Sequence, residues 1–396
     1  MRNMGQNEEH GMMATLVSGD LPRSRWLAGA LLLLLACLAG GPFLFADVRV
    51  FTLLGTMMIF ILVATSYDLM LGYVHMVSFA HMLFFALGAY GVALATHYLG
   101  PTLAAVAVGL GLALLCSLLL ALVLGALTLR VQAIFFALAT LAVAFACVQL
   151  VLQAYPLTGG VDGLRVRLPA VLGPGHRLFQ DRLPGLDLPR LLRGLWLDPA
   201  AAWEQARFSL YFTGRHLVYY ASFVLSLAGV LLLFRVVRSS FGRVLLAIRE
   251  NEFRARALGY RTVDYRIAAV VLAGLLTCIA GAAFALFNRY VSPATTLSFD
   301  LMVFILLICV IGGMGTLYGA VLGAAVFLLA QGYLQDVLTI VVGVAPGSHL
   351  WGALFAPQRW LLWLGVLFVL CVYWFPDGIV GRLRAAARQG TTRQEG

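Results

Sequence analysis

The chain has no lysine, and all of its 27 basic residues are arginine. A nucleotide-binding P-loop needs a lysine to reach the phosphates, so the sequence excludes such a site in this chain. Any ATP-driven activity would therefore reside in another polypeptide. Cysteine is also scarce: the six cysteines lie far apart inside apolar stretches, and no pair has metal-ligand spacing. We expect no metal, no cofactor and, since no catalytic motif is present, no enzymatic activity.

Charge is scarce as well, at 11% of 396 residues, whereas 62% of residues are hydrophobic and the mean hydropathy is +0.94. An average soluble domain has about 25% charged residues. The net charge of +10 is spread among acids and apolar runs, without the basic, aromatic-interleaved patch that binds nucleic acid. The composition therefore predicts an all-α polytopic integral membrane protein surrounded by a lipid bilayer, with no nucleic-acid partner.

Ten apolar segments are predicted to form membrane helices, since most of them reach the roughly 20 residues that span the hydrocarbon core. The two short segments, Phe299–Gly313 and Leu317–Leu334, are expected to form either a kinked hairpin or a partly re-entrant element. The first segment is longer than the core of a signal peptide, so we expect a retained anchor. The segments are Trp26–Ala46, Val50–Leu71, Met76–Tyr98, Thr102–Leu129, Val131–Gln153, Leu217–Val237, Ile267–Phe287, Phe299–Gly313, Leu317–Leu334 and Trp360–Phe375.

The distribution of arginine predicts the orientation of the membrane domain, residues 26–381, because short cytoplasmic loops are enriched in positive charge. With ten crossings and the N-terminus inside, the arginine-rich loop 238–266 is cytoplasmic, together with the N-terminal tail 1–25 and the basic tail 382–396. Residues 154–216 form an extracytoplasmic lobe that is rich in proline and glycine. The lobe holds eight arginines, but loops of this length cross the membrane largely regardless of charge.

The cytoplasmic loop 238–266 has the pattern of a short amphipathic helix. A serine is suited to cap its start, and Gly259 is suited to end it in the left-handed conformation that glycine adopts at little cost. On these features alone the helix is either a docking element or an ordinary solvated loop helix. Its apolar face comprises Phe241, Val244, Leu245 and Ile248, and its expected ion pairs, four residues apart, are Glu250–Arg254 and Glu252–Arg256.

The stretch FGRVLLAIRENEFRARALGY, residues 241–260, closely resembles the coupling loop of branched-chain amino acid ABC transporter permeases. Other blocks resemble that family in the family's order, and only the segment 165–215 is unmatched and longer than usual. In this chain Asp68 stands where the family usually has asparagine, and Phe253-Arg254-Ala255 stands where the broader importer motif has Glu-Ala-Ala. The matching blocks are LGYVHMVSFAHMLFFALGAY (71–90), LTGGVDGL (157–164), NRYVSPATTLSFDL (288–301), VIGGMGTLYGAVLGA (310–324) and FPDGIVG (375–381).

This resemblance implies the transmembrane permease subunit of an ABC importer in the bacterial cytoplasmic (inner) membrane. The implied substrates are branched-chain or other apolar amino acids. The implied partners are a second homologous permease subunit, two cytoplasmic ATPase subunits that hydrolyse the ATP, and a periplasmic or tethered substrate-binding protein. The coupling-loop residues that the resemblance places at the ATPase are Arg249, Glu250, Asn251, Glu252, Arg254, Ala255 and Gly259.

Three alternatives stay open at the level of sequence. A urea or short-chain amide ABC importer has permeases that share most of these blocks. An ion-coupled secondary transporter would need inverted repeats and broken midplane helices with ion ligands, and no internal repeat is evident here. A non-transporting membrane scaffold would leave the coupling-loop motif unexplained.

Polar residues inside the apolar segments are candidates for a translocation path, because such groups are costly in lipid and usually face a cavity or the bundle interior. Ser78, His81, Tyr90 and Asn288 form this candidate set, with hydrogen bonding between helices as the alternative role. Asp68 lies near the cytoplasmic end of its segment, so we expect the membrane interface to solvate it.

Three glycines repeat every four residues in the apolar sequence that follows residue 313. Gly315, Gly319 and Gly323 would let another helix approach closely. The seam they predict lies either at the translocation path or subunit interface, or simply inside the bundle.

Overall fold

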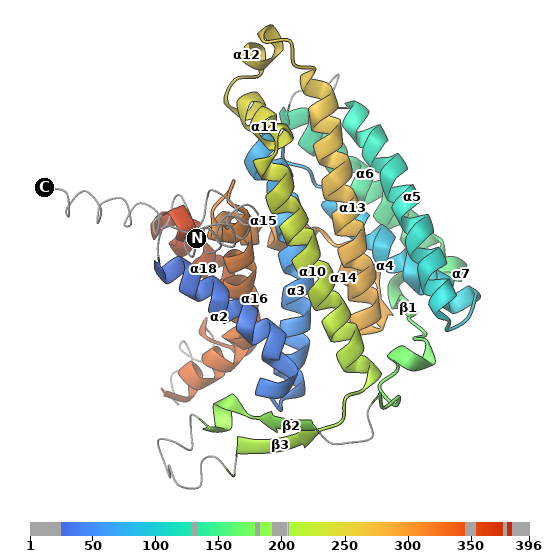
Figure 1. Ribbon diagram of the computed structural model, residues 1–396, viewed down its shortest axis with the longest axis vertical. Coiled ribbons are helices and arrows are strands. Elements are labelled where there is room, and N and C mark those ends of the chain that lie inside the picture. Colours follow the sequence, from blue (N-terminus) through green and yellow to red (C-terminus); the bar gives the residue numbers. More distant parts are fainter. Residues whose placement is uncertain are drawn as a thin grey trace, which may run out of the picture.

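The computed structural model describes residues 25–127, 133–178, 183–191, 204, 206–344, 354–374 and 378–381. The predicted tail 382–396 and all but the last residue of the predicted tail 1–25 lie outside these residues. The described chain is a bundle of long helices, with a helical loop projecting from one end and short strands at the other (Figure 1).

Each of the ten predicted apolar segments forms a helix in this part of the chain. Eight helical stretches within it are long and apolar enough to cross a membrane, and α4 and α18 are not among them. The chain is therefore a multi-pass helical membrane protein, and the number of complete crossings stays a prediction. The ten helices are α2 (Arg25–Leu44), α3 (Val48–Asp68), α4 (His81–Tyr98), α5 (Leu103–Leu127), α6 (Ala133–Gln153), α10 (Gly214–Arg238), α13 (Thr262–Asn288), α15 (Phe299–Gly312), α16 (Leu317–Val344) and α18 (Trp360–Trp374).

A break separates α3 from α4. Helix α3 continues into the π-helical turn η1 (Leu69–Val74), and His75 then adopts a left-handed conformation with φ of 62°. The predicted start of the third segment at Met76 is therefore wrong, because α4 begins only at His81. The hydroxyl of Ser78 accepts a hydrogen bond from the backbone N–H of Ala80 at 3.2 Å, which helps to order the chain ahead of α4.

The two short predicted segments form two separate helices, α15 and α16, which pack against each other. The short α14 (Pro293–Thr296) precedes α15, whose 14 residues would span only about 21 Å at 1.5 Å per residue. Helix α16 has 28 residues and runs to Val344, well past the predicted end at Leu334. Polar residues in its second half lower the hydropathy there, so the apolar pattern ended before the helix does. One of these residues, Asp336, forms an ion pair with Arg49 at 2.8 Å.

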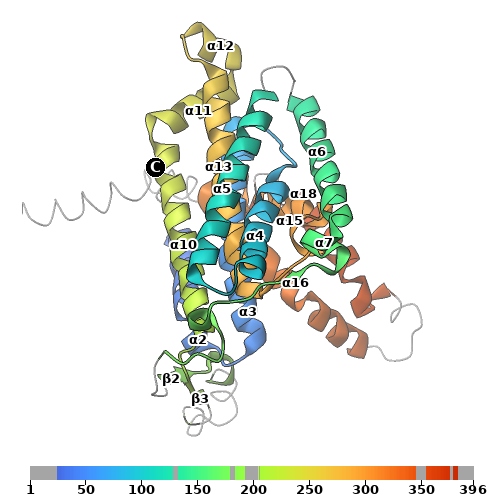
Figure 2. The same ribbon diagram turned by 90° about the vertical axis from the view of Figure 1, so that its right-hand side faces the viewer.

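The centre of the bundle is the contact between α4 and α13, with α5 and α3 packed beside them (Figure 2). The two helices approach so closely that glycine is required on both. A Cβ atom on Gly88 would lie 1.8 Å from the carbonyl oxygen of Cys278, and one on Gly281 would lie 1.9 Å from that of Phe85. Small residues of this kind are what allow helix backbones to meet in a membrane protein.

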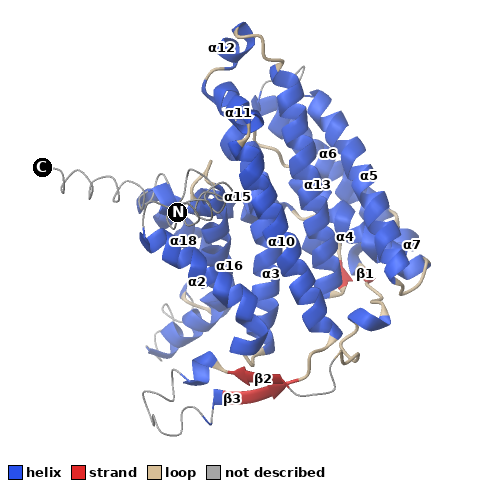
Figure 3. Cartoon of the chain, viewed as in Figure 1, coloured by secondary structure: helices blue, strands red, loops and turns tan. Residues whose placement is uncertain are grey.

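The lobe opposite the helical loop contains short strands that the sequence did not predict (Figure 3). Strand β1 (Leu164–Arg165) pairs antiparallel with β4 (Tyr290–Val291), and β2 (Leu183–Leu186) pairs antiparallel with β3 (Arg207–Leu210). The described part of the lobe has a small buried cluster of its own around Leu191 and Ala206, while Val166 is buried in the main core of the bundle. Short helical turns complete the outer segments: α7 (Tyr155–Thr158), η2 (Gly160–Asp162), η3 (Ala170–Leu172) and η4 (Pro357–Arg359).

Both ends of the described chain lie near the turn between α15 and α16. Leu27 at the start of α2, Tyr318 at the start of α16 and Val380 form one buried cluster. The guanidinium of Arg249, from the helical loop, reaches Gly315 in the same turn. The start of α2 and residues 378–381 therefore lie toward the loop end of the bundle. This arrangement agrees with the predicted sidedness, which itself stays a prediction.

We predict that Gly88→Leu destabilises the protein strongly, because the larger side chain would meet the backbone of α13. Overpacking of a core costs about 1–3 kcal/mol, and more where only backbone can yield. Thermal unfolding of the detergent-solubilised protein measures the effect. Gly111→Leu is the matched control, since a Cβ at Gly111 in α5 meets no atom within 4 Å among the described residues. Equal melting temperatures for the two variants would contradict the proposed packing.

Candidate functional site

The helical loop between α10 and α13 begins with an amphipathic helix, α11 (Ser240–Glu250). Val244, Leu245 and Ile248 are buried, and the ring of Phe241 stacks on that of Tyr265 at 5.5 Å between centroids. The predicted apolar face is thus confirmed. It packs against η1 and α13, so the helix is held on the bundle.

The loop contains two helices, whereas the sequence pattern predicted one. The backbone of Asn251 is extended, with φ of −159° and ψ of 100°, and it separates α11 from α12 (Glu252–Ala257). Its side-chain Oδ1 caps α12 by accepting a hydrogen bond from the backbone N–H of Arg254 at 2.9 Å. Glu250 and Arg254 therefore lie on different helices, and the predicted ion pair between them is absent from the described loop.

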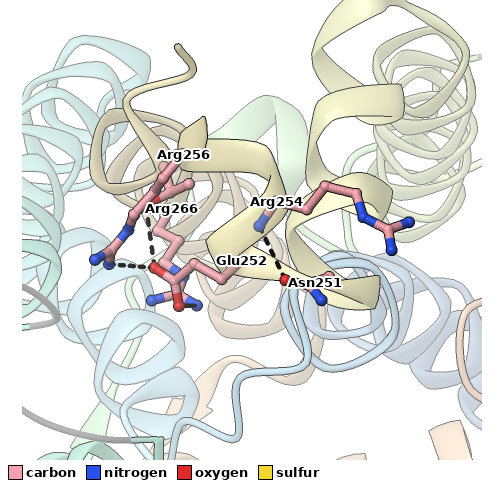
Figure 4. Close-up of polar contacts among 6 residues, drawn as sticks. Asn251, Glu252, Arg254, Arg256 and Arg266 are labelled. Carbon is pink, nitrogen blue, oxygen red and sulfur yellow. Dashed lines mark hydrogen bonds and ion pairs between the residues drawn. The ribbon is translucent and has the colours of Figure 1, made fainter. Parts of the chain in front are cut away.

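Glu252 ties α12 to the start of α13 (Figure 4). Its Oε1 accepts hydrogen bonds from Arg256 at 2.5 Å and from the hydroxyl of Thr262 at 3.1 Å, and its Oε2 accepts one from Arg266 at 2.8 Å. The predicted Glu252–Arg256 pair is confirmed as part of this larger network. Burial alone would raise the pKa of the Glu252 carboxyl, but Arg266, Arg256 and Thr262 together lower it below its ordinary value of 4.5.

Gly259 ends α12 with φ of +90°, as predicted. The N–H of Gly259 bonds to the carbonyl of Arg256, and the N–H of Tyr260 bonds to the carbonyl of Ala255, which is the Schellman pattern of a helix end. Ala255 is buried against Val244 and Ile248, so its role is to seat α12 on α11.

The far end of the loop exposes apolar side chains. Phe253 is 83% exposed, Leu258 71% and Tyr260 43%. We call these three residues, with Gly259, the loop tip. Sequence reasoning centred on the charged residues of this segment and missed the apolar ones, although apolar residues interleaved with arginines in this loop were the available signal. Exposed apolar side chains on a loop that projects from the bundle make it a candidate interaction site.

Two of the sequence-predicted residues point away from the loop tip. Nη1 of Arg249 donates a hydrogen bond at 2.5 Å to the carbonyl oxygen of Gly72 in η1. Asp68 is fully buried, and its Oδ1 accepts a hydrogen bond from the N–H of Gly315 at 2.8 Å. The expectation that the interface solvates Asp68 is therefore wrong, because η1 and the turn after α15 cover it.

Among the candidate translocation residues, Ser78 and His81 are brought together at the break before α4, and both are buried. The His81 ring packs edge-on against Tyr67, with 4.7 Å between centroids. Neither ring nitrogen of His81, nor the Tyr67 hydroxyl, has a hydrogen-bond partner among the described residues. Buried polar atoms without partners cost free energy, so these groups are candidates for contact with water or a ligand.

Tyr90 and Asn288 are not joined to this pair by any hydrogen bond within the described chain. Tyr90 lies more than two turns further along α4, and its buried hydroxyl also lacks a partner there. Asn288 is the last residue of α13, and its Nδ2 donates to the carbonyl of Phe284 at 3.4 Å. A shared translocation path for all four residues stays a prediction.

The glycine seam is only partly as predicted. Gly315 lies outside the helix, in the turn between α15 and α16, and has φ of +77°. Gly319 and Gly323 do lie in α16 and face α15: a Cβ on Gly323 would meet the carbonyl oxygen of Ile308 at 2.2 Å. The repeat of four thus combines a turn glycine with two packing glycines, and the packing is internal to the bundle.

Long apolar helices and a structured loop with an apolar tip, held outside them, define a multi-pass helical membrane protein. The family model described as "Branched-chain amino acid transport system / permease component" matches residues 49–372. The chain belongs to this family. The match includes the whole helical loop and every helix named above except α2, the first residue of α3 and the last two residues of α18.

Similar proteins carry names that agree with the family. The chain is 27% identical over 328 residues to the high-affinity branched-chain amino acid transport system permease protein LivM of Salmonella typhimurium, covering 83% of this chain and 69% of the relative. It is 30% identical over 165 residues to a probable LivM of Methanocaldococcus jannaschii, covering 41% of this chain and 46% of the relative. It is also 30% identical over 164 residues to the autoinducer 2 import system permease protein LsrC of Yersinia pestis, covering 40% of each chain. No solved structure matches the chain significantly.

We predict that Glu252→Gln loosens α12 from α13 by about 0.5–1 kcal/mol, the range for partly exposed ion pairs. Hydrogen exchange of the backbone amides of residues 252–262 measures it, and Glu250→Gln, outside the network, is the control. Because the folded pKa of Glu252 is lowered, its contribution is complete above the ordinary pKa of 4.5 and is lost as the pH falls through the folded value. Protection in the unmodified loop should therefore drop only in acid, and Glu252→Gln should lack that acid-dependent step. An equal loss of protection in acid in Glu252→Gln and in the unmodified protein would contradict the role of Glu252.

Proposed function

We propose that this chain is the membrane subunit of an ABC importer for branched-chain or other apolar amino acids, in the bacterial inner membrane. The observation that carries the proposal is the loop tip. Phe253, Leu258, Gly259 and Tyr260 are exposed on a pair of helices that is capped, ion-paired and packed on the bundle. Because the chain belongs to a family of transport-system permeases, we infer that this loop binds an ATPase subunit.

The partners follow from what this chain lacks. It contains no lysine for a P-loop, so ATP hydrolysis belongs to cytoplasmic ATPase subunits that bind the loop tip. A second homologous permease subunit and a substrate-binding protein on the outer side complete the importer, with two ATPase subunits in the assembly. Purified alone in liposomes, the chain is expected to show neither ATP hydrolysis nor concentrative uptake.

The substrate class rests on the names of the relatives. The relatives that match over most of this chain are named for branched-chain amino acid transport, while the LsrC relative matches over 40% of it. The break before α4, with the unpartnered His81 and Tyr67 atoms, is the segment that we assign to the translocation path. Discontinuous helices at midplane depth commonly form such sites in transporters.

We predict that Phe253→Asp abolishes leucine uptake, because it places a charge where an apolar ring would be buried against the ATPase. Loss of a central aromatic anchor costs about 2 kcal/mol or more, which is roughly a thirtyfold or greater loss of affinity. Co-purification of the ATPase subunit with the tagged permease measures docking, and radiolabelled leucine measures transport. Leu119→Asn, an exposed apolar position on α5 away from the loop, is the control for general damage. Normal uptake and co-purification in Phe253→Asp would remove the basis for the proposed docking.

A second prediction concerns the substrate. In cells or liposomes carrying the complete importer, excess unlabelled isoleucine or valine should suppress labelled leucine uptake, and excess urea should not. Apolar side chains that differ by one methylene are separated by only about 1–3 kcal/mol in a hydrophobic site, so mutual competition is expected. Competition by urea, with none by valine, would assign the chain to the short-chain amide class instead.

A further inference from the structure

Arg249 connects the helical loop to the bundle in a way that docking to an ATPase does not require. Its side chain leaves the exposed side of α11 and turns inward, and Nη1 donates to the Gly72 carbonyl in η1. Gly72 is buried. The apolar contacts of α11 with the bundle are not directional, whereas this hydrogen bond fixes one position of α11 relative to η1. Arginine is suited to this task, because its planar guanidinium presents several donors in a rigid arrangement.

The Gly72 backbone packs directly on the turn between α15 and α16. A Cβ on Gly72 would lie 2.3 Å from the Gly315 nitrogen and 2.5 Å from Oδ1 of Asp68. A Cβ on Gly315 would lie 2.8 Å from Nη1 of Arg249, and the positive φ of Gly315 favours glycine independently. Since neither position has room for a side chain, η1, the turn and the guanidinium are in mutual contact.

Asp68, at the end of α3, contacts the same turn between α15 and α16. Its Oδ1 accepts a hydrogen bond from the N–H of Gly315, and its Oδ2 is buried without a hydrogen-bond partner among the described residues. We call Asp68, Gly72, Arg249 and Gly315 the Arg249 junction. Three elements far apart in sequence meet there: the end of α3 with η1, helix α11, and the turn that joins α15 to α16.

The elements that meet at the junction lead to the parts of the bundle that are least regular. η1 is a π-helical turn, a form that is rare and frequent at functional sites. It continues into the break that carries Ser78 and His81, and then into α4. On the other side, Gly313 of the turn packs against Gly378, where a Cβ would lie 2.3 Å from the Gly313 Cα. A displacement of α11 would therefore reach η1, the break and the turn together.

We propose that Arg249 is a positioning residue that transmits the movement of α11 to η1 and to the turn between α15 and α16, and that it does not bind the ATPase. The inference rests on the proposed function, since it is the ATPase that would move α11. It assigns the loop two separate faces: the loop tip receives the partner, and Arg249 passes the displacement inward. Substituting Arg249 should therefore uncouple transport from ATP hydrolysis without releasing the ATPase.

The first experiment uses the complete importer, with its ATPase and binding protein, in liposomes. Arg249→Met removes the donor and keeps the length of the stem, Arg249→Lys keeps one charged donor, and Arg243→Met is the control at an exposed arginine of the same helix. For Arg249→Met we expect the ATPase to co-purify and hydrolysis to stay within about twofold, while leucine uptake falls about tenfold, a typical size for coupling between sites. Arg249→Lys should restore part of the uptake, and Arg243→Met should behave as the unmodified protein.

Several results would overturn the assignment. Loss of ATPase co-purification in Arg249→Met would make Arg249 a docking residue, and an unchanged ratio of uptake to ATP hydrolysis would make its hydrogen bond irrelevant to coupling. If Arg249→Met does not accumulate in the membrane, Arg249→Gln takes its place in the same comparison. If the unmodified chain binds no ATPase at all, the proposed function fails, which is a different outcome from failure of the junction.

The second experiment measures movement directly. With the native cysteines replaced, a spin label at Met314, which is 50% exposed in the turn, and another at Ala247 on α11 report on the two sides of the junction. In the unmodified importer both spectra should change between the nucleotide-free and the ATP–vanadate state. In Arg249→Met the Ala247 label should still respond and the Met314 label should not. A Met314 label that responds equally with and without Arg249 would overturn the proposal.

Discussion

The close approach of α4 and α13 is the contact on which the rest of the structure depends. In a bilayer the hydrophobic effect does not drive helices together, because lipid tails are as apolar as the helix surfaces. Helices therefore associate through tight packing and interhelical hydrogen bonds. Gly88 and Gly281 supply that packing by letting each backbone touch the other. Helix α13 carries the helical loop at its first turn, through Thr262 and Arg266, and leads at its other end into β4. The seam thereby fixes the loop relative to the bundle.

The helices were predictable because the signal for them is local. Apolar composition over about 20 residues is enough to place a membrane helix, since backbone groups in lipid must bond within the segment. The breaks between them were not predictable in the same way. Positive φ is uncommon in any residue other than glycine, so the sequence around His75 did not indicate a break there. The turn η1 that precedes His75 packs against Gly315, which is distant in sequence. The length of α16 was hidden by polar residues such as Asp336, whose partner Arg49 is equally distant.

In the helical loop, too, features that depend on nearby residues were predicted and others were not. The left-handed Gly259 and the Glu252–Arg256 pair depend on neighbours within a few residues, and the sequence predicted both. The break at Asn251 was missed because a helical pattern continues across it, while an asparagine capping the second helix competes with that pattern. The burial of Asp68 was missed because only the folded chain brings the turn at Gly315 over the end of α3.

The unpartnered polar atoms of the core are concentrated near the break. Oδ2 of Asp68, the hydroxyl of Tyr67 and both ring nitrogens of His81 are buried without partners among the described residues. Each such group costs about 1–3 kcal/mol relative to a satisfied one. The groups that carry these costs lie between the Arg249 junction and the start of α4. The α4–α13 seam, further along α4, is tightly packed. If the break rearranges, these atoms have no hydrogen bonds to described residues to lose. We infer that a small displacement of α11, applied through Arg249 at one end of that segment, is passed on there.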